Sequence, residues 1–266
     1  GAQGPSNTIT CAEASGALSV GESLRVIQRD NADGCFCGGA ESKLNPMAYF
    51  RQQLAERLTS ENNDNPDRAV RPFCETATGT AIGEGGGILV IEALDTFQAR
   101  NGESAYAEIV GFGASQSVHR QALNRKPDPE GKAITLAARR ALDEADVDPT
   151  DVDLVVPNGM SQPDWDASEA QALKNIFGDH LADVAIAPTK SMVGNCMAGA
   201  SGFDLCVAAK AVAEQTVPTV INCDTPRDGL PAINGASHER NIRHALVLGS
   251  GFGGQNAALL LRRMES

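Results

Sequence analysis

Short apolar runs alternate with longer stretches of helical periodicity along most of this chain. Strands are predicted over residues 7–11, 34–38, 85–94, 105–115, 154–157, 184–187, 245–248 and 257–262. Helices are predicted between them, over residues 15–27, 47–58, 133–145, 168–177 and 198–214. This alternation predicts an α/β fold in which strands buried on both faces are layered between helices.

A pair of prolines interrupts this pattern near the middle of the chain. Pro127-Asp-Pro129 and the polar residues after it are typical of a loop between structural units. They predict a division into two α/β halves, residues 1–126 and 127–266.

The charge balance argues against several classes of partner. Asp and Glu total 34 and Lys and Arg total 22, which gives a net charge of −12 without a basic cluster that would bind nucleic acid. No apolar run approaches the roughly 18 residues of a membrane helix, and the first residues do not resemble a signal peptide. We therefore expect a cytoplasmic protein with neither a nucleic-acid nor a membrane partner.

Cysteine and histidine give little indication of a metal site. The seven cysteines contain no Cys-x-x-Cys pair, which suits a reducing cytoplasm. Cys35 and Cys37 could form a soft metal pair on one face of a strand, but small buried hydrophobes are the favoured interpretation. We expect no metal and no cofactor. The four histidines are expected in exposed polar stretches; they are His119, His180, His238 and His244.

Two motifs allow both a structural and a functional interpretation. Gly83-Glu-Gly-Gly-Gly87 is as rich in glycine as a phosphate-binding loop, but it precedes a strand and lacks the Lys-Ser/Thr of such loops. Close backbone packing or a turn is therefore favoured. Asp164 and Asp166 flank the only tryptophan, and capping of the helix predicted near Ser168 is favoured over binding of a cation.

A series of longer motifs makes the chain recognisable. In order they are Gly38-Gly-Ala-Glu41, Arg71-Pro-Phe73, Gly83-Glu-Gly85, Asn158-Gly-Met-Ser-Gln-Pro163, Glu169-Ala-Gln-Ala172, Pro188-Thr-Lys-Ser-Met-Val-Gly194, Ala198-Gly-Ala200, Val217-Pro-Thr-Val-Ile-Asn222 and Gly251-Phe-Gly-Gly-Gln-Asn256. With these motifs the chain resembles the β-ketoacyl-[acyl-carrier-protein] synthases over essentially its whole length. The resemblance implies a thiolase-like fold with α-β-α-β-α layers, built from two duplicated α/β halves and usually dimeric.

The resemblance also implies a complete C-terminal half and only a partial N-terminal half. It begins at the strand that precedes the family's nucleophile, and the family's earlier strands have no counterpart in this sequence. Two explanations stay open: the sequence is a fragment, or a separate chain supplies those strands.

The family's catalytic Cys-His-His residues are expected to be replaced in this chain. Alignment of Ser15-Gly16 with the turn after the nucleophile places Glu13 at the cysteine position. The two histidine positions hold Asn158 and Asn195. Cys11 is expected to lie buried on the preceding strand and is disfavoured as a nucleophile.

Four further positions complete the expected site. Lys190 matches the family's site lysine, and Phe252 matches its gating phenylalanine. Met160 and Gln162 stand where the family has two threonines that typically hold the pantetheine arm of the carrier protein.

These replacements predict the loss of condensation. A glutamate is a weak nucleophile toward a thioester, and asparagine amides cannot shuttle protons, although they can donate hydrogen bonds to an oxyanion. The pattern is similar to the chain-length-factor subunits of type II polyketide synthases. It predicts a non-condensing subunit of fatty-acid or polyketide biosynthesis. Such a subunit would form a homodimer or pair with an active ketosynthase-like chain, with acyl carrier protein as a further partner.

Two alternatives stay open. In the first, the protein is an enzyme with altered acyl-thioester chemistry, in which Glu13 is a general base at a site with Lys190 and the two asparagines. In the second, it is a structural remnant whose site residues have drifted. Because an unpaired acid in an apolar pocket is unfavourable, pairing of Glu13 with Lys190 or with the two asparagines would favour a retained role.

Overall fold

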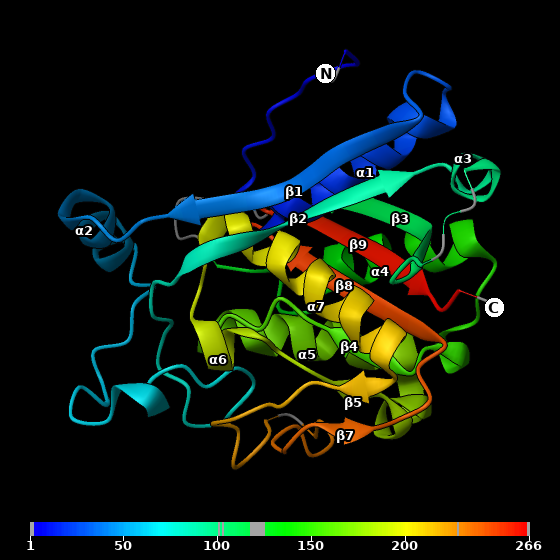
Figure 1. The fold of residues 1–266 in the computed structure, drawn as a ribbon. Coiled ribbons are helices and arrows are strands. Elements are labelled where there is room, and N and C mark those ends of the chain that lie inside the picture. The colour runs from blue at the N-terminus through cyan, green and yellow to red at the C-terminus, as the bar shows by residue number, and fades with distance from the viewer. Residues whose placement is uncertain (1–2, 101, 103, 118–125, 228, 265–266) are drawn as a thin grey trace.

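The protein folds into stacked layers of helices and strands (Figure 1). The computed structural model describes residues 3–100, 102, 104–117, 126–227 and 229–264, so His119 lies outside the described residues. Helix α4 (Lys132–Ala145) packs on one face of a five-stranded sheet, with α5 (Pro163–Phe177) beside it. Helices α1 (Ser15–Gln28) and α7 (Ala200–Glu214) lie between the sheet and a two-stranded ribbon. The predicted layered α/β fold is confirmed.

The five-stranded sheet forms the centre of the molecule. Its strand order is β3-β9-β8-β4-β5; β4 is parallel to β8 and β5, whereas β9 is antiparallel to β8 and β3. All of β8 is buried, and in β9 only the two terminal residues are partly exposed. Because helices cover these strands, they appear in the sequence as continuous apolar runs. The strands are β3 (Glu108–Gln116), β4 (Leu154–Val156), β5 (Ala185–Ile186), β8 (His244–Ser250) and β9 (Gln255–Arg262).

The ribbon pairs β1 (Gly34–Ser42) with β2 (Glu84–Glu92) in antiparallel register. The run at 34–38 is therefore part of a longer strand, and it is not buried on both faces as predicted. Cys37 and its partner Leu89 face the helices, whereas Phe36 and its partner Val90 are 76% and 71% exposed. The ribbon thus presents an apolar outer face.

The glycine-rich segment at the start of β2 has a packing role. A Cβ atom added to Gly87 would stand 2.3 Å from the carbonyl oxygen of Gly202 in α7, so a side chain there would push the ribbon off the helix. The favoured interpretation of Gly83–Gly87 as a close-packing segment agrees with this geometry.

Several predicted boundaries were wrong. Residues 7–11 form no strand, because none of the described strands pairs with them, and Cys11 is half-buried. Helix α2 (Pro46–Leu54) ends four residues before the predicted end. Helix α5 begins at Pro163, not near Ser168, so Asp166 lies inside the helix and does not cap it. Asp164 is exposed, and its carboxylate lies 3.4 Å from the Lys126 ammonium.

The remaining elements are short, and the sequence pattern did not predict them. They are α3 (Leu94–Ala99), α6 (Lys190–Val193), β6 (Thr216–Val217), β7 (His238–Glu239) and the 3-10 turns Ala12–Ala14, Pro66–Arg68, Pro149–Asp151, Gly178–Asp183 and Met197–Gly199. One expectation about histidine was also wrong. His244 is buried, with Nδ1 3.0 Å from the carbonyl oxygen of Asp151.

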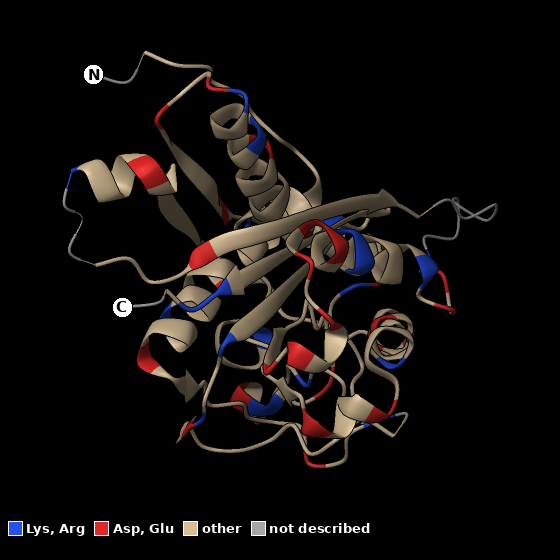
Figure 2. Ribbon diagram, turned by 90° about the vertical axis from the view of Figure 1, so that its right-hand side faces the viewer, with Lys and Arg blue, Asp and Glu red and all other residues tan. Residues whose placement is uncertain are grey.

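The surface carries both signs of charge. In the view of Figure 2, Lys and Arg are dispersed among Asp and Glu over several helices and loops. Across the described residues, none of the helices is both long and apolar enough to cross a bilayer, and no group of three His, Cys, Asp or Glu could hold a metal ion.

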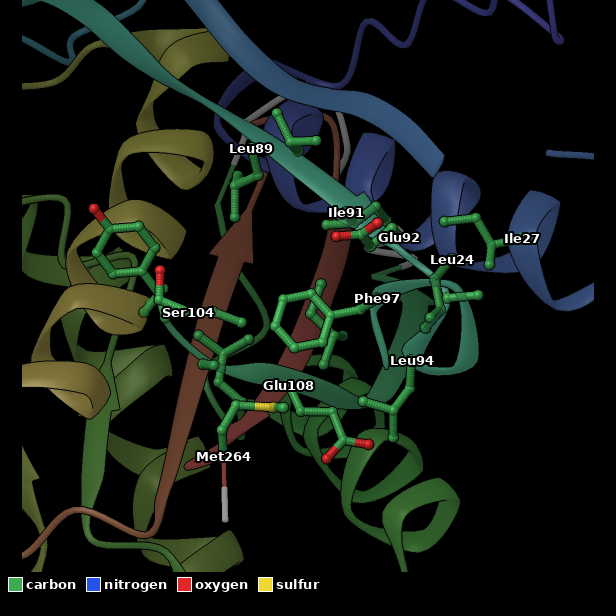
Figure 3. A pocket seen from close by; sticks show the side chains of 18 of the residues that line it. Leu24, Ile27, Leu89, Ile91, Glu92, Leu94, Phe97, Ser104, Glu108 and Met264 are labelled. Carbon is green, nitrogen blue, oxygen red and sulfur yellow. The ribbon is translucent and has the colours of Figure 1, made fainter. Parts of the chain in front are cut away.

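A groove of about 890 Å³ lies along β2, beside α1, α3, α7 and β3 (Figure 3). Its walls are mostly apolar and include Leu24, Leu89, Ile91, Phe97 and Met264. None of the predicted site residues lines this groove. The predicted site residues lie away from this groove, and the first of them in the chain, Glu13, lies just before α1.

Candidate functional site

Glu13 lies in the 3-10 turn Ala12–Ala14, which leads directly into α1. Its side chain is fully buried. Ser15, the first residue of α1, fixes this turn, because its hydroxyl accepts the N–H of Cys11 at 2.8 Å and donates to the carbonyl of Ala12 at 2.7 Å. The carboxylate of Glu13 is thereby directed into the molecule.

Two side chains bind the same carboxylate oxygen of Glu13. The Asn195 amide nitrogen donates to Oε1 at 3.0 Å, and Nη2 of Arg57 donates to it in a buried ion pair. Asn195 is itself oriented, because its Oδ1 accepts the N–H of Met197 at 2.9 Å. The structure thus brings together Glu13 and Asn195, which are separated by 182 residues in the sequence.

Arg57 is the principal member of the site that the sequence did not predict. It follows α2 and is only 3% exposed. Its Nη1 donates to Gln52 Oε1 at 2.9 Å, and its guanidinium carbon lies 4.5 Å from the ring centroid of Phe252. The guanidinium nitrogens also lie 3.8 Å from the sulfur of Met160 and 3.9 Å from that of Met197.

An aromatic contact extends this cluster. The ring of Phe252 stacks on Trp165 of α5, with centroids 5.5 Å apart and an interplanar angle of 25°. Phe252 belongs to the glycine-rich turn between β8 and β9, at residues 251–254. Arg57, Phe252 and Trp165 therefore form a continuous series of contacts that begins at Glu13.

The charges determine the protonation state of Glu13. Burial alone would raise the pKa of this carboxyl, but the charge and hydrogen bond of Arg57, together with the Asn195 amide, outweigh burial and hold the pKa below its ordinary value. Glu13 is therefore an anion that Arg57 neutralises, and its affinity for a proton is low.

Asn158 and Lys190 form a second, adjacent cluster. Lys190 donates from Nζ to the backbone carbonyl of Asn158 at 2.5 Å and to its Oδ1 at 3.2 Å, and it lies 3.7 Å from a carboxylate oxygen of Asp204. The amide nitrogen of Asn158 donates to the carbonyl of Ser250 at 3.3 Å. Both ends of the Asn158 amide are thus already bound to protein groups.

Two buried carboxylates of α5 hold the loop that carries Asn158. Glu169 accepts the backbone N–H groups of Asn158 and Gly159, both at 2.8 Å. Asp166 accepts those of Met160 and Phe73, also at 2.8 Å. Desolvation by burial raises the pKa of each carboxyl to about 7. The sequence contains a signal for this role. The two acids are spaced i, i+3 on one face of a helix whose neighbouring residues are apolar, and such a face is more often buried than exposed to solvent.

The two remaining predicted residues lie at the edge of the Arg57 cluster. Met160 is buried against Arg57, and Gln162 donates to the carbonyl of Glu56 at 3.3 Å. Within the described structure, the buried oxygen Oε1 of Gln162 has no hydrogen-bond partner. The predicted site residues therefore divide into two groups. Glu13, Met160 and Phe252 contact Arg57, with Asn195 bound to Glu13 and Gln162 bound to the residue before Arg57, whereas Asn158 and Lys190 form a pair.

Comparison with known proteins identifies the family of the chain. Residues 1–96 match the beta-ketoacyl synthase N-terminal domain, and residues 106–224 match the beta-ketoacyl synthase C-terminal domain. The chain is 34% identical over 268 aligned residues to 3-oxoacyl-[acyl-carrier-protein] synthase 2 of Staphylococcus aureus (strain COL), covering 100% of this chain and 63% of that protein. The chain thus spans less than two thirds of the length of this relative.

Two solved structures are similar throughout the described fold. One is a type II polyketide synthase acyl-carrier protein in complex with its ketosynthase bound to the hexaketide, with a TM-score of 0.93, 26% identity and coverage of 98% of this chain and 64% of that one. The other is the ishigamide ketosynthase/chain length factor, with a TM-score of 0.86, 30% identity and coverage of 98% and 61%. The fold is the thiolase-like ketosynthase fold, and the chain belongs to the beta-ketoacyl synthase family.

Proposed function

We propose that this chain is a non-condensing ketosynthase-like subunit of fatty-acid or polyketide biosynthesis. The observation that carries the proposal is the state of Glu13. Where the family resemblance expects a reactive cysteine, this chain has a buried carboxylate bound by Arg57 and Asn195. A charge-neutralised carboxylate attacks a thioester poorly, and the anhydride it would form is readily hydrolysed.

The two asparagines support the same conclusion. Condensation needs groups that move protons and donors that stabilise the developing enolate. An amide does not titrate near neutral pH. In addition, the nitrogen and oxygen of both Asn158 and Asn195 are engaged with protein groups. Each amide nitrogen keeps a second N–H that could donate to an oxyanion, but neither amide can carry a proton to or from a substrate.

The geometry argues against the alternative in which Glu13 is a general base. A base that works near neutral pH needs a raised pKa, whereas Arg57 and Asn195 lower that of Glu13. Lys190 also contacts the Asn158 and Asp204 cluster, and the described structure shows no ion pair between Lys190 and Glu13.

The proposal includes a ketosynthase-like partner chain, with this chain itself or an active ketosynthase as that partner. Two structural neighbours are a ketosynthase/chain length factor and a ketosynthase in complex with acyl-carrier protein. The apolar outer face of the β1–β2 ribbon, which includes Phe36, Ile88 and Val90, is the kind of surface that marks a protein contact. A stable monomer at micromolar concentration in sedimentation would contradict the pairing.

Intact-mass spectrometry after incubation with an acyl-carrier thioester tests the loss of condensation. We expect no acyl adduct on the unmodified protein, while a full-length 3-oxoacyl-[acyl-carrier-protein] synthase treated in parallel serves as the positive control. The variant Glu13→Cys/Asn158→His/Asn195→His should gain a trace of adduct only when Arg57, which would otherwise stay beside the new thiol, is replaced by Ala as well. An adduct on the unmodified chain would overturn the proposal. A folded quadruple variant that forms no adduct would contradict the claim that these residues account for the loss of condensation.

A further inference from the structure

We propose that Arg57 determines what this site can bind, because its side chain occupies the space beside Glu13 and excludes an acyl thioester. The inference rests on the proposed function in one respect: it assumes that Glu13 marks the family's acyl site. It adds a steric reason why an acyl thioester cannot bind in this site, and that reason does not depend on the missing nucleophile.

The position of Arg57 is fixed by its backbone. The preceding residue, Glu56, has a left-handed conformation with φ of 54°, which ends α2 and turns the chain inward. The backbone of Arg57 is then bound on both sides, since its carbonyl accepts the N–H of Thr80 at 2.9 Å and its N–H donates to Gln52 at 3.2 Å. The side chain therefore enters the site from a fixed point.

The guanidinium fills a space bordered by four separate segments of the chain. Glu13 lies in the turn before α1 and Met160 in the loop after β4. Met197 lies in the turn before α7, and Phe252 lies between β8 and β9. Arg57 contacts all four side chains, so no acyl group could lie between these segments while Arg57 remains in place.

Arg57 is held by one charge and by packing rather than by a complete set of hydrogen bonds. Within the described structure, its Nε is buried without a hydrogen-bond partner, and so is Oε2 of Glu13. Asp204, another fully buried acid, is paired with Lys190. A shorter neutral side chain at position 57, with Glu13 made neutral as well, should therefore leave a cavity lined by thioethers and an aromatic ring. Such a lining suits an acyl chain.

Three double variants, each with Glu13→Gln, test whether the volume of the side chain at position 57 determines which acyl thioesters bind in the site. Arg57→Met keeps most of the volume without charge, Arg57→Val keeps less, and Arg57→Ala keeps least. The probes are the octanoyl and butanoyl thioesters of N-acetylcysteamine. Trp165, the only tryptophan, stacks on Phe252, so its fluorescence reports binding beside Arg57.

We expect no saturable change for the unmodified protein or the Arg57→Met variant with either probe at millimolar concentration. The Arg57→Val variant should bind only the butanoyl probe. The Arg57→Ala variant should bind the octanoyl probe at least about tenfold more tightly than the unmodified protein does. Circular dichroism and cooperative unfolding identify the folded variants, and a folded Arg57→Val variant is sufficient if Arg57→Ala does not fold.

The inference is overturned if the unmodified protein binds the octanoyl probe as tightly as the Arg57→Ala variant, or if the folded smaller variants bind neither probe. These results differ from a failure of the proposed function. Binding to the unmodified protein without an acyl adduct would refute exclusion by Arg57 and leave the non-condensing role standing. An adduct would refute the non-condensing role itself.

Discussion

Replacing Glu13 with alanine should be among the most damaging single changes in this protein. The side chains of Glu13 and Arg57 are 0% and 4% exposed, so the substitution leaves a guanidinium buried without its carboxylate. Removing one partner of a buried pair typically costs about 3–5 kcal/mol, because the remaining charge has lost both water and its counter-charge. We expect Glu13→Ala to lower the free energy of unfolding by about that amount.

A double variant separates the charge effect from the loss of packing. Glu13→Gln with Arg57→Met removes both charges and keeps similar volumes, and replacement of a buried ion pair by neutral groups is often neutral or stabilising by about 1–4 kcal/mol. The double variant should therefore be at least as stable as the unmodified protein. Glu13→Gln alone should be less stable, because Arg57 stays charged.

Urea unfolding gives these free energies. The fluorescence of Trp165 follows the transition, because this residue stacks on the Phe252 ring beside Arg57 and loses that contact on unfolding. Glu92→Ala is the matched control, because it removes the carboxylate from a surface pair whose Arg100 side chain is 57% exposed, and it should shift the midpoint little. Equal losses in Glu13→Ala and Glu92→Ala would refute the reasoning. So would additive losses in the double variant, since the pair would then not be coupled.

Two further outcomes follow from other buried groups. Burial raises the pKa of Asp166 and Glu169 to about 7 from their ordinary values of 3.8 and 4.5, so between these values the folded protein binds more protons than the unfolded chain. The free energy of unfolding should therefore fall as pH rises from about 4.5 to 7, and urea midpoints that rise over this interval would contradict it. Gly87→Ala places a Cβ 2.3 Å from the Gly202 carbonyl and should cost roughly 1–3 kcal/mol, as measured by urea unfolding. Gly235→Ala has no atom within 4 Å of the added Cβ and should leave the midpoint unchanged, so equal shifts would refute the packing argument.

The fold could be predicted where local pattern and tertiary burial coincide. The strand at 245–248 and the helix at 133–145 were found because helices cover β8 and because α4 carries one apolar face. Residues 7–11 carry a strand-like pattern but pair with none of the described strands, and a strand is stabilised by its partner rather than by its own sequence. The outer face of β1 was misjudged for a related reason, since periodicity cannot show which apolar residues are covered.

The candidate site was only partly predictable from the sequence. Glu13, Asn158 and Asn195 could be singled out because motifs surround them. Arg57 lies in no such motif, and it reaches the site only because α2 ends early and Glu56 turns the backbone inward. A partner that is 44 residues distant from Glu13 is set by tertiary structure, so the sequence pattern contains no signal for it.

The ion pair bears on whether this site is a drifted remnant. A buried glutamate without Arg57 would be an unpaired anion, and a buried Arg57 without Glu13 would be an unpaired cation; either alone is strongly destabilising. Two apolar residues would fill the same space at lower desolvation cost, so fold stability alone gives no reason to keep the pair. The backbone beside it is also held, because Asp166 and Glu169 accept four backbone N–H groups, three of them from residues 158–160. A charged pair beside a backbone held in this way is better explained by a retained role, in which Arg57 closes the site, than by the loss of all function.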